Sequence, residues 1–391
     1  MDILKRAREI SGEVIANRRQ LHENPELGFE LDKTVAFVKE KLKEMGYEPR
    51  DCGNHGVTAC VGGKRAGGCV LLRGDMDALP MQEDSGLPFA SKTDGIAHTC
   101  GHDTHTAMLL GAAKILKEME DELHGTVKLM FQPAEELCGG AKSMVEDGIL
   151  ENPKVDAALG IHSMAMDPFG VLGITAGPMF ASADMFRIRV VGKGGHGALP
   201  AVSIDPVNAA AHILINLQEL MAREISGADN AVLTIGSLQG GTAANIIPAE
   251  ATLLGTLRTY DPEIRSFLLG RIDEMARYTA KTFRAEAEFT VLSSCPTAAC
   301  DPAVTERMVQ AIRAVLGEEM VNDCHCILTG SEDFGYVSEK VPSAFFTLGS
   351  DRRDGTEMYP QHHPKIRFDE ETFVNGVAAY CAAAAAWLEN Y

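Results

Sequence analysis

The middle of the chain contains a self-contained series of strand-like and helix-like segments, and this series most constrains the fold. Strands are predicted where apolar and polar residues alternate, and helices where apolar residues recur every three or four positions. The predicted order is strand, helix, strand, strand, helix, strand, which is the order of a ferredoxin-like α+β unit. We therefore expect residues 183–294 to form an inserted domain. Its segments are 185–194, 205–224, 231–238, 249–259, 262–283 and 285–292.

The segments on either side of this insertion alternate between helix and strand. Such alternation is typical of an α/β layer built on a mostly buried sheet. A chain of 391 residues exceeds the size that one hydrophobic core usually supports, so we expect a discontinuous larger domain from 1–182 and 295–391. The predicted helices are 3–14, 33–45, 104–119, 303–316 and 370–389, and the predicted strands are 57–61, 69–73, 126–131, 157–161 and 343–348.

Composition and charge narrow the class of partner. The formal net charge is -19 and the sequence pI is near 5.1, which disfavours nucleic acid and anionic membrane surfaces. No apolar run approaches the roughly 20 residues of a membrane-spanning helix. The first residues, MDILKRAREI, place charges where a signal peptide needs an apolar stretch, so we expect a cytoplasmic protein. The ten cysteines follow no disulfide framework and are expected to be reduced.

The densest group of reactive side chains lies between residues 98 and 105, in the sequence HTCGHDTH. Cys100 and His102 offer the thiolate and imidazole ligands that zinc and similar divalent metals prefer, and their spacing lets both point the same way from a loop. The alternative is a helix N-terminus capped by Asp103 or Thr104. The two interpretations are compatible.

Two adjacent carboxylates, Glu135 and Glu136, follow the predicted strand at 126–131. In an α/β sheet, ligands bind beyond the carboxyl ends of the strands. One of two such carboxylates can bind a metal while its neighbour acts as general base on an activated water. An isolated pair of glutamates is more often a solvated helix start, so only the surrounding motifs favour the catalytic interpretation.

Single histidines and acids occupy similar positions. His162 follows a predicted strand, and His362 and His363 stand in the sequence QHHP. A lone histidine is usually a surface or core residue, but these lie where the sheet is expected to deliver side chains to one edge. Asp75 and Asp77 stand in the sequence RGDMDALP. Their spacing would let them orient ligand histidines by hydrogen bonds without binding the metal themselves, or else form a turn.

These residues belong to a longer set of motifs that occur in a fixed order. The motifs are RRQLHENPELGFE, RGDMDALP, HTCGHDTHT, FQPAEE with GGAKSM, GIHSM, GKGGHGALP, GTAANIIP, SEDFG and HHP, and they run from residue 18 to 364. The ordered set resembles peptidase family M20, in its amidohydrolase subfamily of hippurate hydrolases, N-acyl amino acid hydrolases and indoleacetyl-amino acid hydrolases. The resemblance implies a mixed-sheet, zinc-exopeptidase-like catalytic domain with an inserted ferredoxin-like lid and dimerisation domain.

The resemblance also implies a site that holds two divalent cations, such as zinc, manganese, cobalt or nickel, and cleaves the amide bond of N-acyl amino acids. Glu135 is the implied general base, and Asp77 is the implied supporting acid. The choice of His362 over His363 follows the family pattern His-x-Pro. The implied metal ligands are Cys100, His102, Glu136, His162 and His362.

In the inserted domain, the resemblance implies that His196 and Asn245 hold the scissile carbonyl oxygen. His196 would reach the site of a neighbouring subunit, which implies a homodimer. Arg258 would pair with the substrate carboxylate, because a guanidinium binds a carboxylate in a fork.

Other functions stay open at this stage. The same site would suit a dipeptidase or aminopeptidase, or an N-acetyl-diaminopimelate deacetylase. A metal-buffering protein would need Glu136 but leave Glu135 without a role. A redox protein would use Cys100 as a reactive thiol, but no resolving cysteine stands at Cys-x-x-Cys spacing. The segment 324–326 (CHC) resembles a further metal site, although its pattern predicts a strand outside the motifs.

Overall fold

The computed structural model describes residues 1–323 and 327–389, so the further metal site considered at 324–326 lies outside the described residues. Contacts between the described residues divide the chain into two compact units. The larger unit comprises 1–179, 299–323 and 333–389, and the smaller unit comprises 180–298 and 327–332.

The segment 327–332 differs from the predicted domain boundaries, which placed it in the larger domain. Its backbone is bonded to the smaller unit instead. The Ala181 N–H donates to the carbonyls of Leu328 at 3.2 Å and Gly330 at 3.0 Å, and the Tyr260 hydroxyl donates to Leu328 at 3.2 Å. This short segment therefore packs with residues that precede it by about 70 to 150 positions.

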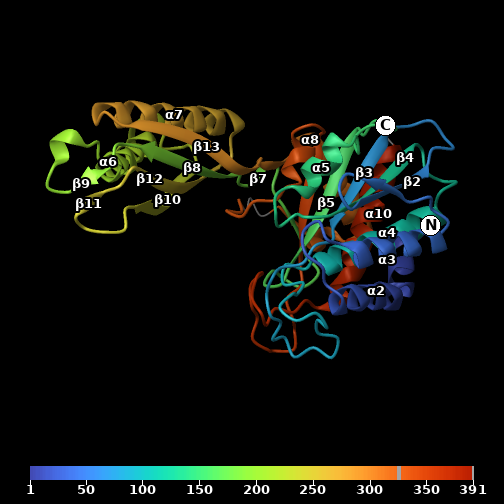
Figure 1. Cartoon of the computed structure of the whole chain (residues 1–391). Coiled ribbons are helices and arrows are strands. Elements are labelled where there is room, and N and C mark those ends of the chain that lie inside the picture. The colour runs from blue at the N-terminus through green and yellow to red at the C-terminus, as the bar shows by residue number, and fades with distance from the viewer. Residues whose placement is uncertain (324–326, 390–391) are drawn as a thin grey trace. The chain divides into compact units, whose positions relative to one another are not determined.

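An eight-stranded mixed sheet forms the centre of the larger unit, in the order β1-β2-β4-β3-β5-β16-β6-β15 (Figure 1). The neighbours β4, β3, β5 and β16 run parallel, whereas β1, β2 and β4 pair antiparallel. The four central parallel strands are buried on both faces, as expected of a sheet covered by helices. The predicted α/β class with a mixed sheet is confirmed. The strands are β1 Arg50–Cys52, β2 Gly56–Gly62, β3 Cys69–Asp75, β4 Thr126–Gln132, β5 Ala157–Met164, β6 Leu172–Ile174, β15 Val321–Asp323 and β16 Ser343–Gly349.

Helices cover this sheet, with α4 and α10 packed on β3 and α5 packed on β4. The predicted helix at 3–14 is two helices, because the chain breaks at Ile10. None of the helices among the described residues is long and apolar enough to cross a membrane. The helices of the larger unit are α1 Ile3–Glu9, α2 Ser11–Glu23, α3 Asp32–Glu44, α4 His102–Glu118, α5 Gly140–Glu146, α8 Pro302–Leu316, α9 Gly335–Ser338 and α10 Phe373–Glu389, with 3-10 turns at Glu318–Met320 and Glu370–Thr372.

The smaller unit is the predicted ferredoxin-like arrangement. Its four-stranded antiparallel sheet has the order β10-β12-β8-β13, and α6 and α7 pack on one face through a core of buried aliphatic residues. Asp205-Pro206 and Asp261-Pro262 begin the two helices, because each aspartate accepts backbone N–H groups of the first turn and each proline starts the helix without a free N–H. The elements are β8 Ala183–Val191, α6 Pro206–Glu219, a π-helical turn Leu220–Glu224, β10 Ala231–Gly240, β12 Glu250–Thr259, α7 Pro262–Thr282 and β13 Glu286–Cys295.

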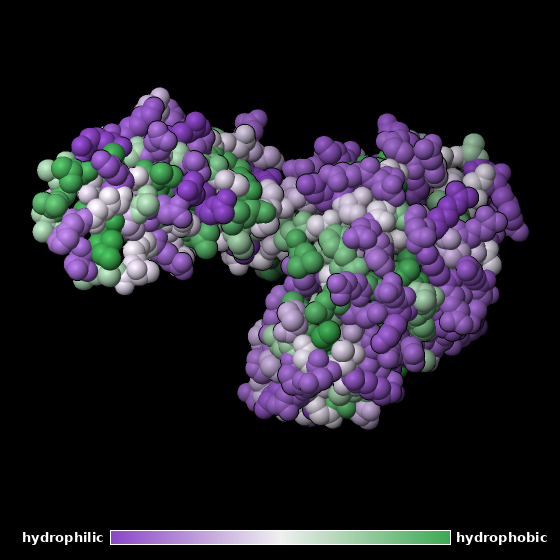
Figure 2. All heavy atoms as spheres, in the orientation of Figure 1, coloured by the Kyte–Doolittle hydropathy of each residue, from purple (hydrophilic) through white to green (hydrophobic). Residues whose placement is uncertain are grey.

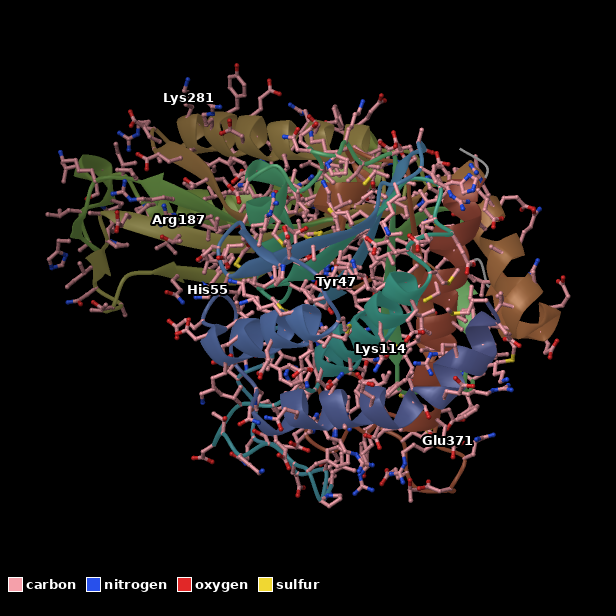
Figure 3. All side chains as sticks on the ribbon, turned by 90° about the vertical axis from the view of Figure 1, so that its right-hand side faces the viewer. Tyr47, His55, Lys114, Arg187, Lys281 and Glu371 are labelled. Atoms are coloured by element: carbon pink, nitrogen blue, oxygen red, sulfur yellow. The ribbon has the colours of Figure 1, made fainter. Side chains whose placement is uncertain are left out.

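Side chains alternate along β8, with Phe186 and Ile188 in the core and Arg187 outside. The remaining short elements are a two-stranded sheet of β9 Gly195–His196 and β11 Ile246–Ile247, the 3-10 turn Pro200–Val202, and a pair formed by β7 Gly177–Phe180 and β14 Ala298–Cys300. Figure 2 shows apolar atoms at the end of the smaller unit that carries β9 and β11, and Figure 3 shows Arg187 on the sheet. Leu199, Val202 and Ile246 are 58%, 66% and 56% exposed there.

Candidate metal centre

Three neighbouring parallel strands deliver side chains to one edge of the large sheet. Asp75 ends β3, and Asp77 follows it by two residues. Glu135 and Glu136 follow β4, and His162 lies near the end of β5. Because parallel strands end at the same edge, these side chains meet although they are far apart in the sequence.

Cys100 and His102 reach this edge from the start of α4. Gly101, between them, adopts φ of 101°, and an added Cβ would lie 2.7 Å from the Phe368 ring. Only glycine fits this left-handed turn without strain. The turn sets the directions in which the side chains of Cys100 and His102 point. His362 arrives from the loop before α10, and its backbone N–H donates to the Thr99 carbonyl at 2.9 Å.

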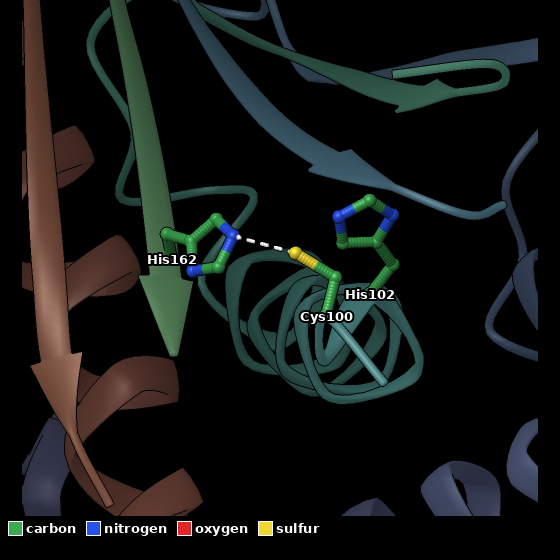
Figure 4. A group of neighbouring side chains, drawn as sticks. All are labelled: Cys100, His102 and His162. Carbon is green, nitrogen blue, oxygen red and sulfur yellow. Dashed lines mark hydrogen bonds between the residues drawn. The ribbon is translucent and has the colours of Figure 1, made fainter. Parts of the chain in front are cut away.

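The five predicted ligand residues lie together. The Cys100 Sγ is 3.4 Å from His162 Nε2, as drawn in Figure 4, and 3.3 Å from His362 Nε2. Glu136 Oε1 is 3.2 Å from His362 Nε2 and 4.0 Å from His102 Nε2. Ligand atoms at about 2.0 to 2.3 Å from a shared cation are separated by such distances.

Buried polar atoms without hydrogen bonds show that these residues fit a cation. His102 Nδ1 donates to the Asp77 carbonyl at 2.9 Å, so in the neutral ring Nε2 is the atom that carries the lone pair. This Nε2 is buried and has no hydrogen-bond partner among the described residues. His162 Nδ1 likewise donates to the Ser163 carbonyl at 2.9 Å and leaves its Nε2 toward Cys100. Buried polar atoms are nearly always paired, so this arrangement suits metal ions held by thiolate, imidazole and carboxylate.

The Asp77 carboxylate holds the chain between the ligands. It is 1% exposed and accepts the backbone N–H groups of Glu135 at 3.0 Å and Glu136 at 3.2 Å. Its Oδ1 also lies 3.3 Å from His102 Nδ1. One buried carboxylate therefore contacts two segments that carry candidate ligands, the turn after β4 and the start of α4.

Asp75 and His105 form a buried pair beside the cluster, and Asp75 Oδ2 also lies 3.6 Å from His102 Nε2. His105 Nδ1 lies 2.6 Å from Asp75 Oδ1, and its Nε2 accepts the Ser163 N–H at 2.7 Å. Both nitrogens of His105 are thus engaged, so it offers no lone pair to a metal. The other oxygen of Asp75 lies 2.8 Å from Arg73 Nη1, and this ion pair is fully buried.

Burial raises the pKa of the Cys100 thiol to about 12, although His102 acts in the opposite direction. Burial also holds the pKa of His162 well below its ordinary value, so this imidazole is neutral and able to act as a ligand. A coordinating thiol is deprotonated by its metal. Without a cation this thiol is therefore protonated at neutral pH, which disfavours a free reactive thiolate.

Glu135 lies beside the cluster and is buried. It is 7% exposed, its Oε2 is 3.8 Å from His102 Nε2, and its Oε1 accepts the Asp333 N–H at 3.4 Å. Of the two histidines in QHHP, only His362 points to Cys100. His363 stacks on Tyr359 with ring centroids 4.3 Å apart.

His196 and Asn245 lie together in the smaller unit. His196 pairs with Ile246 across the β9 and β11 sheet, and the Gly197 N–H donates to the Asn245 carbonyl at 2.8 Å. Both side chains are exposed. His196 Nδ1 accepts the Ala198 N–H at 3.0 Å, so the proton resides on Nε2, which is free to donate.

Arg258 lies at the opposite end of the same unit. It is eight residues beyond Glu250, at the far end of β12, and strands rise about 3.3 Å per residue, so about 26 Å separates the two strand ends. Its Nη1 donates to the Thr329 carbonyl at 3.2 Å. Within one chain, the structure does not bring Arg258 together with His196 and Asn245.

A buried polar network lies behind the cluster and was not predicted from the sequence. Arg73 Nε donates to Gln132 Oε1 at 2.8 Å, and Gln132 Nε2 donates to Asp333 Oδ1 at 2.6 Å. Asp333 Oδ2 accepts the Ala141 N–H at 3.0 Å. Arg73, Gln132 and Asp333 belong to motifs quoted above, so the signal was present, but no local pattern indicates that they touch.

Known proteins resemble this chain over nearly its whole length. It is 39% identical over 379 residues to an N-acetylcysteine deacetylase of Bacillus subtilis (strain 168), covering 96% of this chain and 97% of that protein. It is 37% identical to an IAA-amino acid hydrolase of Arabidopsis thaliana, covering 96% of this chain and 86% of that one.

The fold matches solved structures as well. One of them, described as a dinuclear metal binding peptidase from Bacillus subtilis, has a TM-score of 0.84 and 35% identity and covers 98% of this chain and 100% of its own. The sequence model of Peptidase family M20/M25/M40 matches residues 71–386, which is most of the chain. The motifs, the mixed sheet and this match agree, and the chain belongs to peptidase family M20.

Proposed function

We propose a residue-level mechanism for the metal-dependent amide hydrolysis of N-acyl amino acids that this family membership supports. The cations would be held by Cys100, His102, Glu136, His162 and His362, whose donor atoms lie 3.2 to 4.0 Å apart along the cluster. Bound divalent cations supply two things at such a site, polarisation of a carbonyl and a lower pKa for water. Zinc, manganese, cobalt and nickel all accept this ligand set.

Glu135 acts as the general base and then as the general acid. Its carboxylate takes a proton from the attacking water and delivers a proton to the leaving amine. The supporting observation is its position, because it lies 3.8 Å from His102 Nε2 while the adjacent Glu136 turns toward His362. Asp77 holds both backbone N–H groups of this pair, so the two carboxylates keep different directions.

The smaller unit contributes substrate contacts and acts as a lid and dimerisation domain. Arg258 binds the substrate carboxylate, and His196 and Asn245 donate hydrogen bonds to the scissile carbonyl oxygen as it gains charge. A small substrate cannot span the roughly 26 Å between the strand ends that carry these groups. We therefore assign His196 and Asn245 to the site of a second copy of the chain.

The edge strand β10 supports this homodimer. Its sequence, AVLTIGSLQG, contains no charged residue and no proline, and its only partner in the described sheet is β12. A long uncharged edge strand is a ready template for pairing with another chain. The exposed Leu199, Val202 and Ile246 add apolar area on the same unit.

The preferred substrate is an N-acyl amino acid with a free carboxylate. This choice rests on Arg258 and on relatives named for N-acetylcysteine and for IAA-amino acid conjugates. A dipeptidase or aminopeptidase activity, or an N-acetyl-diaminopimelate deacetylase activity, would use the same groups on a different acyl or amine component. We propose that the reaction takes place in the cytoplasm.

The test is hydrolysis of a panel of acetyl-, benzoyl- and indoleacetyl-amino acids and free dipeptides by the purified chain, metal-free and then reloaded with zinc or manganese. We expect reloading to restore cleavage, and Glu135→Gln to lower kcat by about 100-fold or more while both metals still bind. Glu146→Gln, on the exposed face of α5, is the matched control. Two bound metals without turnover of any substrate would favour metal buffering instead.

A further inference from the structure

We propose that His22 is a positioning residue for the metal centre, because it ties together two chain segments that carry ligands. One segment is the start of α4 with Cys100 and His102, and the other is the loop with His362. This inference rests on the proposed metal site and extends it to the motif RRQLHENPE, to which the mechanism gives no role.

His22 lies between two buried carboxylates. It is on α2 and 4% exposed. Its Nδ1 lies 2.7 Å from Asp103 Oδ2, and its Nε2 lies 3.1 Å from Glu83 Oε1. A carboxylate on each ring nitrogen means that both N–H groups donate, so the ring is held as an imidazolium. Burial and Arg18 oppose this charge, but the two carboxylates outweigh them and raise the pKa of His22.

The first contact fixes the start of α4. Asp103 follows the ligand His102 directly and lies in the first turn of the helix. Its carboxylate is 1% exposed and also pairs with Arg18 Nε at 2.7 Å. Arg18 and His22 are one turn apart on α2, so a single helix face holds Asp103 from two sides. Any displacement of Asp103 is transmitted along the backbone to His102.

The second contact leads to the His362 loop. Glu83 accepts the Ser91 N–H at 2.6 Å, which fixes the loop that contains it. The neighbouring Asp84 N–H donates to the Pro364 carbonyl at 2.8 Å, and Pro364 is two residues beyond His362. Through His22, the loop carrying Glu83 is joined to the same helix face that holds Asp103.

The His362 loop needs such support. His362 adopts φ of 62°, a left-handed conformation that is uncommon for any residue other than glycine. A strained backbone persists only where surrounding contacts determine it. Two backbone bonds flank this residue, from its own N–H to Thr99 and from Asp84 to Pro364. The Glu83 contact with His22 holds the second of these in place.

The experiment measures cobalt binding, because Co²⁺ bound to a thiolate and imidazoles has visible d–d and charge-transfer bands that report ligand geometry. Metal-free full-length wild type, His22→Gln and Glu83→Gln are titrated with Co²⁺ alone. Glutamine has both of its donors on a single nitrogen and carries no charge, so His22→Gln retains at most one of the two contacts. We expect the affinity to fall by about 10- to 100-fold, with shifted bands, in His22→Gln. Glu83→Gln should show a smaller change in the same direction.

His55→Gln is the matched control. The ring nitrogens of His55 lie 3.1 Å from Asn54 Oδ1 and 3.1 Å from Asp32 Oδ1, neither of which belongs to a candidate ligand, and its side chain is 37% exposed. It should leave the Co²⁺ spectrum and affinity unchanged. Urea unfolding of the metal-free proteins separates stability from ligand geometry.

Unchanged Co²⁺ bands and affinity in both variants, with or without a loss of stability, would overturn the inference. Replacement of a histidine with a purely structural role would give that result. If His22→Gln does not fold, the Co²⁺ titration of Glu83→Gln by itself tests the inference. A wild type that shows no thiolate band with Co²⁺ would overturn the metal site and this inference together. A wild type that binds Co²⁺ but cleaves no amide contradicts only the proposed function.

Discussion

Replacing Asp77 by asparagine tests whether this residue orients the metal ligands without being a ligand itself. Asp77 is 1% exposed and accepts the backbone N–H groups of Glu135 at 3.0 Å and Glu136 at 3.2 Å. Asparagine keeps one carbonyl oxygen, so one of these N–H groups loses its acceptor and faces an NH₂ group. The Asp77 carbonyl that accepts from His102 is a backbone atom and survives the change.

The expected loss of metal affinity in Asp77→Asn follows from these contacts. A buried donor without an acceptor costs about 1 to 3 kcal/mol, and the loss of charge weakens the bond that remains. A total of about 2 kcal/mol, acting wholly on the bound state, corresponds to about 30-fold in metal affinity, since about 1.4 kcal/mol is tenfold. This lies within the roughly 10- to 100-fold range of changes to groups that orient metal ligands.

The assay is competition for zinc against a chromophoric chelator, with metal content measured after dialysis. Asp301→Asn is the control, because Asp301 also accepts two backbone N–H groups, of Ala303 and Val304, at the start of α8. Both of these N–H groups are accepted by the same oxygen, Oδ1, which asparagine keeps, so Asp301→Asn should leave zinc affinity unchanged and change the free energy of unfolding little. Wild-type zinc affinity in Asp77→Asn would refute the assignment of Asp77 as the residue that orients the ligands.

Three further outcomes are expected. Gly140→Ala places a Cβ 1.5 Å from the Pro133 carbonyl, so the turn that carries the two glutamates must shift, and urea unfolding should show a loss of at least about 2 kcal/mol; an unchanged midpoint would contradict this. Burial opposes ionisation of Glu83, but hydrogen bonds led by His22 lower its pKa to about 2 from 4.5. Its ionised form therefore stabilises the fold above pH 4.5, and up to about 3 kcal/mol is lost as pH falls to 2. In Glu83→Gln this part of the pH dependence of unfolding should disappear, and parallel curves would show that other groups dominate. Arg258→Gln should raise KM by about 10-fold for a substrate with a free carboxylate and have little effect on its amide analogue, and equal effects on both would remove Arg258 from carboxylate binding.

Local patterns were sufficient for most elements of the fold. Five of the eight strands of the large sheet and the order of the smaller unit were predicted, because strand and helix periodicities are local properties. The three strands that were missed, β1, β6 and β15, have only three residues each, too few to show a period. The break at Ile10 was missed, because α1 and α2 both present apolar residues toward the helices they pack on, α10 and α4, and the spacing continues across the break. The segment 327–332 was misplaced, because its pairing with residues near 180 is formed by backbone atoms that leave no pattern in the sequence.

For the candidate ligands, too, some properties follow from the sequence and others only from the folded chain. By itself, the sequence determined the types of residue available, because thiol, imidazole and carboxylate chemistry depends on the side chain alone. Tertiary structure decided which of them act together. His102 Nε2 is buried without a hydrogen-bond partner among the described residues, whereas both nitrogens of His105 are engaged by Asp75 and Ser163. That difference arises from strand ends brought together by the sheet, and distance in space between residues remote in sequence is set only when the chain folds.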